Sequence, residues 1–433
     1  MGQTGFAIDI YQNEYLPAGG QDVNAIVTVT AQDAEPVPPA EDTDGGSAEV
    51  IIVDCSGSMA YPSTKISQVR LATCAAIDVI RDGVAFSVLA GNDGAWPVYP
   101  EDGRLAIADE KTKQQAKQAV GHLHAAGGTA IGQWLRLART VFSTYPAELR
   151  HAILLTDGKN EHEPRYDLES AISACEGVFS CDCRGVGTDW VVEELRRVSS
   201  GLLGSVDIVP EPSGLAEDFA AMMESSMGKE VADVSLRVWT PQHASVRFVK
   251  QVAPAVAELT SRRTQSGSQE SHFPTGAWGP GESRDYHLCV RVASAAIGQE
   301  MLAARVSLIA GPQAHPEVLA QGLVRAVWTD DEALSTQING HVAHYTGQAE
   351  LAEVIQEGLE ARKRGDEETA TAKLGRAVAL AEKSGNAGTA KLLAKVVDVV
   401  DAATGTVRLK NKVDDADEMA LDTRSTRTVR TRK

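Results

Sequence analysis

Oxygen-bearing side chains recur at three places in the sequence, two of which end hydrophobic segments. Asp54, Ser56 and Ser58 come at the end of an apolar run in the string VIIVDCSGSM. Thr129 follows two glycines in AAGGTAIG, and Asp157 ends the apolar run AILLTD. Divalent cations such as Mg²⁺ prefer oxygen ligands, and two carboxylates with three hydroxyls supply only oxygen. If the fold brings these residues together, we expect a divalent-metal site whose neutral hydroxyls leave much of the metal's charge uncompensated.

An incomplete coordination sphere of this kind is suited to binding a partner rather than to catalysis. A carboxylate from another molecule can occupy the open position and supply the missing negative charge. Ser56 could instead be a nucleophile, but the sequence has no G-x-S-x-G motif and no motif that places a histidine beside it. Asp54 and the two serines could also cap the helix that follows, but a cap does not account for Thr129 and Asp157.

The segments that carry these residues have the pattern of an α/β domain. Apolar runs of strand length alternate with segments of helix length, and GLAEDFAAMMESSMGKE (214–230) is expected to be the closing helix. Strands that are apolar throughout indicate a parallel sheet with helices on both faces. Open sheets of this type bind ligands at the carboxyl ends of their strands. The candidate side chains are therefore expected to meet at one edge of the sheet.

The string D-C-S-G-S at 54–58, with Thr129 in GGTA and Asp157 in TDG, resembles the metal-ion-dependent adhesion site of the von Willebrand factor A family. The resemblance covers residues 47–228. It implies a Rossmann-like, doubly wound, mainly parallel sheet with one antiparallel edge strand. It also implies that Ser56, Ser58 and Thr129 coordinate the metal directly, while Asp54 and Asp157 act through water or as supporting acceptors. The usual work of the family is protein–protein adhesion, in which an Asp or Glu of the partner completes the sphere.

The remaining segments have other periodicities. Residues 1–32 contain two strand-like segments, and residues 229–330 contain alternating segments typical of an antiparallel β-sandwich. We expect one sandwich built from both parts, with a Pro-rich acidic linker (33–46) and the α/β domain inserted between its strands. Residues 331–402 predict a helical hairpin or bundle whose last helix is AGTAKLLAKVVDVVDAA. The glycine-rich segment GAWGPGES (276–283) lacks the Lys-Ser/Thr of a phosphate-binding loop, which argues against an ATPase within this chain.

Residues 403–433 predict a disordered tail, because the segment is highly charged and has little apolar area to bury. Near its end, threonines alternate with arginines: Thr423, Arg424, Thr426, Arg427, Thr428, Arg430, Thr431 and Arg432. Basic residues beside threonines resemble a kinase target, and phosphothreonine peptides are typical ligands of forkhead-associated domains. We therefore hypothesise that the tail is phosphorylated and recognised by such a domain.

Composition narrows the class of protein. The net charge of −18 disfavours binding to nucleic acid and to anionic membranes. The six cysteines form no C-x-x-C pair, so buried thiols in a reducing compartment are expected. The N-terminus lacks the features of a secretory signal. Residue usage resembles that of actinobacterial proteins. The sequence thus predicts a cytoplasmic bacterial interaction module without enzymatic activity that uses Mg²⁺, with Mn²⁺ or Ca²⁺ as alternatives, in stress or phospho-signalling assemblies. A non-catalytic subunit of a metal-chelatase or of an ATPase-driven assembly is the alternative.

Overall fold

The computed structural model of the chain describes residues 5–32, 46–62, 64–311 and 316–431. Apart from Gly46, the predicted linker 33–46 lies outside the described residues. The chain divides into two compact units, one formed by residues 1–37 with 231–433 and the other by residues 38–230. The second unit is therefore inserted in the sequence between two parts of the first.

The inserted unit is built on a mainly parallel sheet, as the sequence predicts. Its strand order is β10-β9-β8-β4-β5-β6, and β7 pairs with β5. All pairs from β10 to β5 are parallel, whereas β6 and β7 run antiparallel to β5. The strands are β4 (Ser47–Asp54), β5 (Ala85–Gly91), β6 (Ala95–Tyr99), β7 (Ala106–Ile107), β8 (Leu149–Thr156), β9 (Ser180–Val186) and β10 (Val206–Val209).

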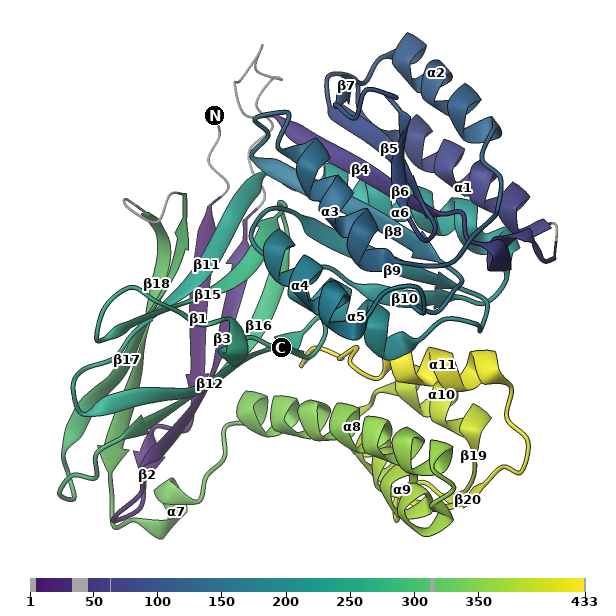
Figure 1. The fold of residues 1–433 in the computed structure, drawn as a ribbon. Coiled ribbons are helices and arrows are strands. Elements are labelled where there is room, and N and C mark those ends of the chain that lie inside the picture. The colour runs from purple at the N-terminus through teal and green to yellow at the C-terminus, as the bar shows by residue number, and fades with distance from the viewer. Residues whose placement is uncertain (1–4, 33–45, 63, 312–315, 432–433) are drawn as a thin grey trace. The chain divides into compact units, whose positions relative to one another are not determined.

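Helices cover both faces of this sheet (Figure 1). They are α1 (Thr64–Val79), α2 (Glu110–Gly121), α3 (Ile131–Phe142), α4 (Arg165–Cys175), α5 (Val192–Gly201) and α6 (Leu215–Met227). Side chains of α1, α2 and α6 share one apolar core with β4 and β5, in which Val69, Val120 and Phe219 are completely buried. Because both faces are covered, β4 is buried along nearly its whole length. This explains why its sequence is apolar up to Asp54.

The other unit contains a β-sandwich, whose strands come from the sequence before and after the inserted unit. One sheet has the order β1-β3-β16-β12-β13 and the other has the order β14-β15-β11-β17-β18-β2. The N-terminal strands are β1 (Phe6–Gln12), β2 (Tyr15–Leu16) and β3 (Asp22–Ala31). The later strands are β11 (Val231–Trp239), β12 (Ala244–Ala253), β13 (Ala257–Glu258), β14 (Thr264–Gln265), β15 (Glu270–Trp278), β16 (Ser283–Val292), β17 (Glu300–Ala310) and β18 (Glu317–Trp328).

Strand β15 lacks the regular alternation of buried and exposed positions that is typical of a sandwich strand. It lies between β14 and β11, although it contains Pro274 and Gly276. The pairing of β11 with β15 is irregular where Val234 faces Gly276, and both Asp233 and Gly276 have positive φ angles. A β-bulge of this type interrupts the alternation that sequence patterns rely on. The end of GAWGPGES is thus the turn between β15 and β16 rather than a ligand-binding loop.

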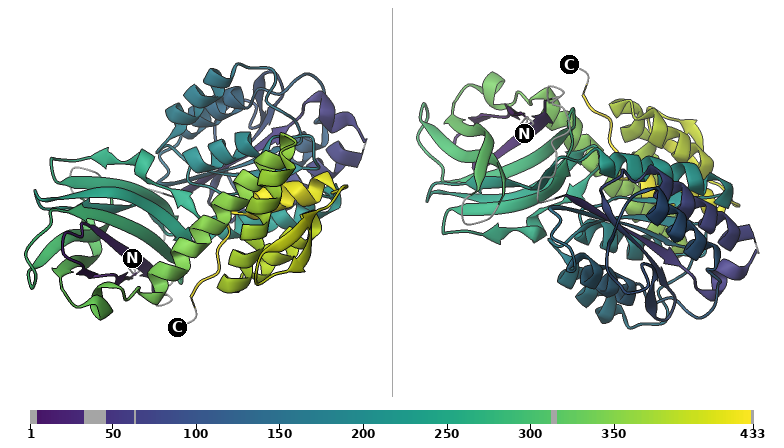
Figure 2. Two further views of the ribbon diagram at one scale, coloured as in Figure 1. Left: turned by 90° about the horizontal axis from the view of Figure 1, so that it is seen from below. Right: turned by 90° about the horizontal axis from the view of Figure 1, so that it is seen from above.

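A helical region follows the sandwich and packs against it. Its elements are α7 (Glu332–Ser335), α8 (Gly340–Lys363), α9 (Glu367–Ser384), α10 (Ala387–Val396), β19 (Val397–Asp401), β20 (Thr406–Leu409) and α11 (Asp415–Arg424). The first turns of α8 place Val342 and Tyr345 against Ile26 and Val252 of the sandwich. Figure 2 shows the start of α8, in green, beside the strands of the sandwich. The prediction of a helix through residue 403 was wrong, because the β-branched segment VDVVD pairs with β20 instead.

The C-terminal segment is ordered, which corrects the prediction of a disordered tail. Its acidic cluster forms the first turn of α11, where Asp414 accepts a hydrogen bond from the backbone of Ala416. Beyond the helix, the backbone amide of Val256 donates to Thr426 and that of Thr428 donates to Pro254. The hydroxyl of Thr428 donates to the carbonyl of Val252, 2.6 Å away. Burial of Val407 and Leu421 in the apolar core of the helical region, together with these polar contacts with the sandwich, therefore orders the segment.

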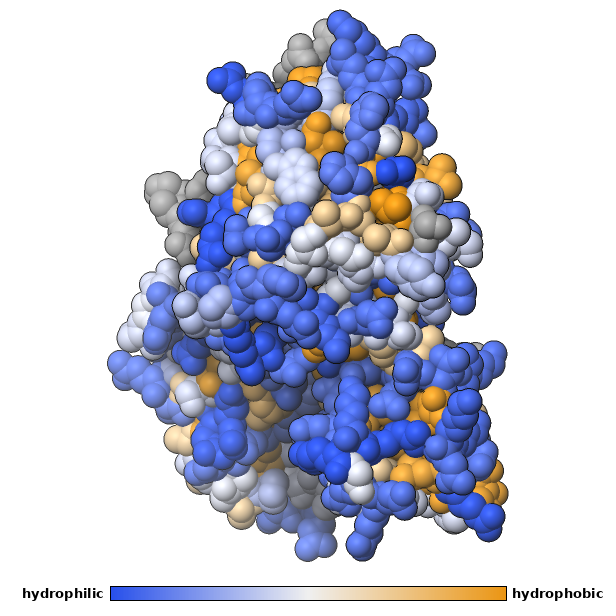
Figure 3. Space-filling view, turned by 45° about the vertical axis from the view of Figure 1, so that its right-hand side comes forward, coloured by the Kyte–Doolittle hydropathy of each residue, from blue (hydrophilic) through white to orange (hydrophobic). Residues whose placement is uncertain are grey.

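The face of the molecule drawn in Figure 3 is mostly polar. Hydrophilic residues dominate the face shown in Figure 3, and hydrophobic residues form separate small patches there. Among the described residues, no helix combines the length and the apolar character needed to cross a lipid bilayer.

Candidate metal centre

The sheet brings together the two carboxylates that the sequence predicts for the site. Strands β4 and β8 are parallel neighbours, with Val53 opposite Leu155, so Asp54 and Asp157 emerge side by side at the carboxyl edge. Asp54 Oδ1 accepts a hydrogen bond from the Ser56 amide (2.7 Å), and Asp54 Oδ2 accepts one from the Thr156 hydroxyl (2.5 Å). The Asp54 carboxylate therefore holds the start of the following loop against the end of β8.

The two serines form a chain of contacts with Asp157. The hydroxyls of Ser56 and Ser58 lie 2.9 Å apart, and the Ser58 hydroxyl donates to Asp157 Oδ1 at 2.6 Å. Ser56 precedes the short 3-10 helix η1 (Gly57–Ala60), but among the described residues its side chain makes no capping hydrogen bond. The capping interpretation thus does not account for the serine hydroxyls, which face each other and Asp157.

Thr129 joins the same group, and Gly158 marks the point around which the hydroxyls gather. A Cβ atom placed on Gly158 would lie 2.8 Å from Thr129 Oγ1, 3.3 Å from Ser58 Oγ and 3.6 Å from Ser56 Oγ. The three hydroxyls, supplied by two separate loops, therefore surround one small space that only a residue without a side chain leaves open. All five residues identified in the sequence are in this cluster.

The burial of two carboxylates favours positive charge in this cluster. Asp54 and Asp157 are fully buried. Burial raises the pKa of Asp54 to about 6, although hydrogen bonds from Ser56 and Thr156 lower it. A carboxylate that loses water on burial is stabilised by a nearby positive charge. Hard oxygen donors arranged around a space of this size, with two acids behind them, fit a small divalent ion.

The loop after β8 positions Thr129, a function that the sequence did not reveal. The Thr129 amide donates to His162 Nδ1 (3.1 Å), and the His162 amide donates to the Thr129 carbonyl (3.1 Å). A Cβ atom on Gly128 would lie 2.1 Å from the His162 ring, so the second glycine of GGTA is needed for this approach. The glycine-histidine contact therefore fixes the position of the Thr129 backbone.

Two neighbours of His162 hold the first turn of α3. The amide of Ile131 donates to Asn160 Oδ1 (2.7 Å), and the amide of Gly132 donates to Glu163 Oε1 (2.6 Å). These side chains satisfy amides at a helix N-terminus that have no partner within the helix. Among the described residues, no group of three or more His, Cys, Asp or Glu side chains is placed to hold a metal ion.

Comparisons with known proteins identify the family of the chain. The family model for the von Willebrand factor type A domain matches residues 48–207, and the model for the von Willebrand factor type A C-terminal domain matches residues 379–425. A solved structure, von Willebrand factor type A from Catenulispora acidiphila, is similar over 99% of this chain and 98% of its own, with 52% identity and a TM-score of 0.93. The chain belongs to the von Willebrand factor A family.

A more distant structure shares only the fold with this von Willebrand factor A protein. The ArnB paralog VWA2 from Sulfolobus acidocaldarius is 13% identical, covers 98% of each chain and has a TM-score of 0.60. No curated protein matches the sequence. Von Willebrand factor A domains commonly bind a divalent metal at a metal-ion-dependent adhesion site, contact protein partners through that site and are typically non-catalytic.

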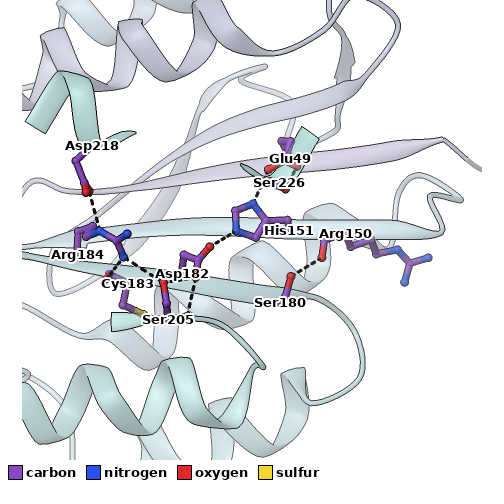
Figure 4. Close-up of polar contacts among 10 residues, drawn as sticks. All are labelled: Glu49, Arg150, His151, Ser180, Asp182, Cys183, Arg184, Ser205, Asp218 and Ser226. Atoms are coloured by element: carbon purple, nitrogen blue, oxygen red, sulfur yellow. Dashed lines mark hydrogen bonds and ion pairs between the residues drawn. The ribbon is translucent and has the colours of Figure 1, made fainter. Parts of the chain in front are cut away.

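A second polar cluster of the von Willebrand factor A domain lies near the amino ends of the strands (Figure 4). His151 Nδ1 is 2.8 Å from Glu49 Oε2, and His151 Nε2 is 3.0 Å from Asp182 Oδ2. Burial alone would lower the pKa of His151, but the two carboxylates raise it to about 10. The Ser226 hydroxyl of α6 donates to the other oxygen of Glu49 (2.6 Å). This charged histidine links three strands to α6, and it contacts none of the five metal-site residues.

Proposed function

We propose that this protein is a non-catalytic interaction module that binds a divalent cation, most suitably Mg²⁺, and uses it to capture a carboxylate of a protein partner. The observation that carries the proposal is the convergence of the Ser56, Ser58 and Thr129 hydroxyls on the space beside Gly158. Asp54 and Asp157 support these hydroxyls from behind and supply negative charge.

The donor set determines what the partner must supply. Three neutral hydroxyls leave much of the charge of a divalent ion uncompensated, so an incoming Asp or Glu side chain completes both the charge and the coordination. Mg²⁺ suits compact oxygen sites that retain some water, and Mn²⁺ or Ca²⁺ are alternatives. The Ser56 hydroxyl contacts Ser58 rather than a histidine, which gives no support to a hydrolytic role.

The test is capture of partners from a lysate of the source organism with and without Mg²⁺, followed by mass spectrometry. Asp54→Ala and EDTA treatment of the natural protein should each abolish capture of the same partner. Asp78→Ala is a matched control, because Asp78 is an exposed acid of the same domain that pairs with Lys117. Capture that persists in both Asp54→Ala and EDTA would show that the metal is not the contact. An ATPase among the captured proteins would favour the chelatase-type alternative.

We also propose a regulatory role for the C-terminal segment, namely recognition of a phosphorylated tail by a forkhead-associated domain. Thr423 is buried, and its hydroxyl donates to the Met419 carbonyl, so it is inaccessible in this state. Thr431 lies 3.0 Å from His341 Nδ1, and Arg430 pairs with Asp285. A phosphate on Thr428 or Thr431 would place negative charge near buried Asp285 and would favour release of the segment.

We expect phosphorylation of Thr428 or Thr431 in the native protein and binding of the phosphorylated chain to a forkhead-associated domain. The phosphomimetic Thr428→Glu should increase the rate of proteolysis after Arg424 or Arg427 by about tenfold, since local release exposes the backbone. Thr404→Glu, on the exposed turn before β20, is the control. Mass spectrometry of the protein isolated from its source that finds no tail phosphorylation under any growth condition would contradict the proposal.

The cysteines are consistent with a proposed cytoplasmic location. All six are free thiols, and Cys181 and Cys183 are both completely buried on β9. Burial raises the pKa of the Cys55 thiol to about 12 and that of Cys175 to about 11, so these thiols are unreactive. Stable free thiols suit a reducing compartment.

A further inference from the structure

Lys65, in the first turn of α1, is buried beside the candidate metal site. Its ammonium group contacts Asp157 Oδ2 in an ion pair, while the other oxygen of Asp157 accepts from Ser58. The Lys65 side chain is 8% exposed and that of Asp157 is 0% exposed. The Lys65 Nζ atom is also 3.7 Å from Asp189 Oδ2, a carboxylate that is largely exposed. Lys65 is therefore a fixed positive charge on the carboxylate that supports the metal site.

A lysine at this position does not favour the formation of helix α1. The N-terminus of a helix carries partial positive charge and disfavours cations, and lysines are rarely buried unless they are paired. The position of Lys65 is thus explained by Asp157 rather than by α1. Any divalent ion among the hydroxyls of Ser58 and Thr129 would share Asp157 with this ammonium group.

We propose that Lys65 is a resident cation of the metal site, which neutralises Asp157 when the metal is absent and weakens metal binding when it is present. The inference rests on the proposed metal-binding function. Two positive charges beside one buried carboxylate repel each other. The repulsion is strong because the low-dielectric surroundings screen it poorly. The site on its own therefore binds the ion weakly, and the partner's carboxylate supplies the charge that secures it. Lys65 makes retention of the metal depend on the partner.

Removal of the ammonium group should have opposite effects on the two states. Lys65→Met keeps a long apolar side chain but leaves Asp157 buried without its counter-ion, so the metal-free protein should melt about 5 °C or more below the natural protein. The same change removes the repulsion, so the affinity for Mg²⁺ should rise about tenfold. A lysine with a purely structural role would lower the stability of both states and would not tighten metal binding.

The experiment is isothermal titration of the full chain with MgCl₂ at constant pH, together with thermal melting with and without Mg²⁺. Lys65→Arg retains the charge and should bind within about twofold of the natural protein. Lys117→Met removes the same charge from a surface ion pair with Asp78 and should change nothing. Tighter binding confined to Lys65→Met, with a larger Mg²⁺-induced gain in melting temperature, supports the proposal.

Other outcomes separate this inference from the proposed function. Mg²⁺ binding by the natural protein with equal or weaker binding by Lys65→Met would overturn the role of Lys65 and leave the metal site standing. Absence of binding by every form would overturn both. If Lys65→Met is unfolded without metal, its refolding by Mg²⁺, followed by circular dichroism, supports the proposal, because the metal then replaces the missing counter-ion. Failure of Mg²⁺ to refold that variant would contradict it.

Discussion

Gly158→Ala is expected to reduce the affinity for Mg²⁺ by about 10- to 100-fold although it removes no oxygen ligand. The new methyl group would lie 2.8 Å from Thr129 Oγ1, too close for an ordinary contact, and it would also crowd the Ser58 hydroxyl. The threonine side chain can rotate away, so the fold should survive, but its oxygen then leaves the metal site. Titration calorimetry with Mg²⁺ measures the loss, and the melting temperature of the metal-free protein should change little.

Gly121→Ala provides the matched control for this prediction. Gly121 ends α2 in the same domain, and a Cβ atom added there would have nothing within 4 Å. This variant should bind Mg²⁺ like the natural protein. If Gly158→Ala also binds normally, the ion does not lie among the three hydroxyls, and the proposed site is wrong even if the protein binds metal elsewhere.

His151→Gln is expected to destabilise the von Willebrand factor A domain by about 3–5 kcal/mol near pH 6, because it leaves the acids Glu49 and Asp182 without their shared counter-charge. Both carboxylates and the histidine come from adjacent strands, so the loss should affect the whole sheet. Urea unfolding monitored by tryptophan fluorescence measures the change, with Trp134 and Trp190 as buried reporters in this domain.

The pH dependence of this stabilisation has a definite sign. The pKa of folded His151 is about 10, above the unfolded value of about 6.5, so its contribution is complete below pH 6.5 and is lost as the pH rises towards 10. Burial would raise the pKa of Asp182, but contacts with His151 and Arg184 lower it overall, so its contribution is lost in acid, below about pH 4. The difference between the natural protein and His151→Gln should therefore be largest between about pH 4 and 6.5.

A triple variant tests whether the effect comes from unpaired charge. Glu49→Gln, His151→Gln and Asp182→Asn together replace the charged cluster by neutral groups of similar shape and should recover most of the lost stability. A single variant that is as stable as the natural protein at pH 6 would show that the cluster contributes little. A difference that grows with pH would contradict the assigned charge on His151.

Sequence patterns were sufficient to predict that the two candidate carboxylates lie together, because both follow strands of one sheet. Asp54 and Asp157 end or follow apolar runs, and two parallel strands in one sheet must place their ends at one edge. The residues that position the site had no comparable signal. Lys65 and His162 are ordinary polar residues in the sequence, and their contacts with Asp157 and Thr129 exist only after distant segments come together.

Outside the site, the predictions failed where tertiary contacts outweighed local pattern. Strand β15 contains a proline and a positive-φ glycine, and its place in the sheet depends on a bulge opposite β11. The segment VDVVD continued a helical pattern but pairs with β20. The tail has few apolar residues, yet Thr428 and Arg430 bond to the sandwich. In each case the deciding partner is far away in the sequence.

The insertion of one unit within the other has a consequence for synthesis of the chain. Strand β3 pairs with β16, and the hydroxyl of Thr28 donates to Asp285, 257 residues later. At about 5–20 residues per second, the ribosome needs roughly 10–50 s to make the second strand after the first. The inserted domain is complete before the sandwich can close. During this interval the apolar side chains of β3, including Val27 and Val29, lack the neighbours that bury them. The nascent protein thus carries an open strand edge for most of its translation, a period in which chaperones have a defined segment to protect.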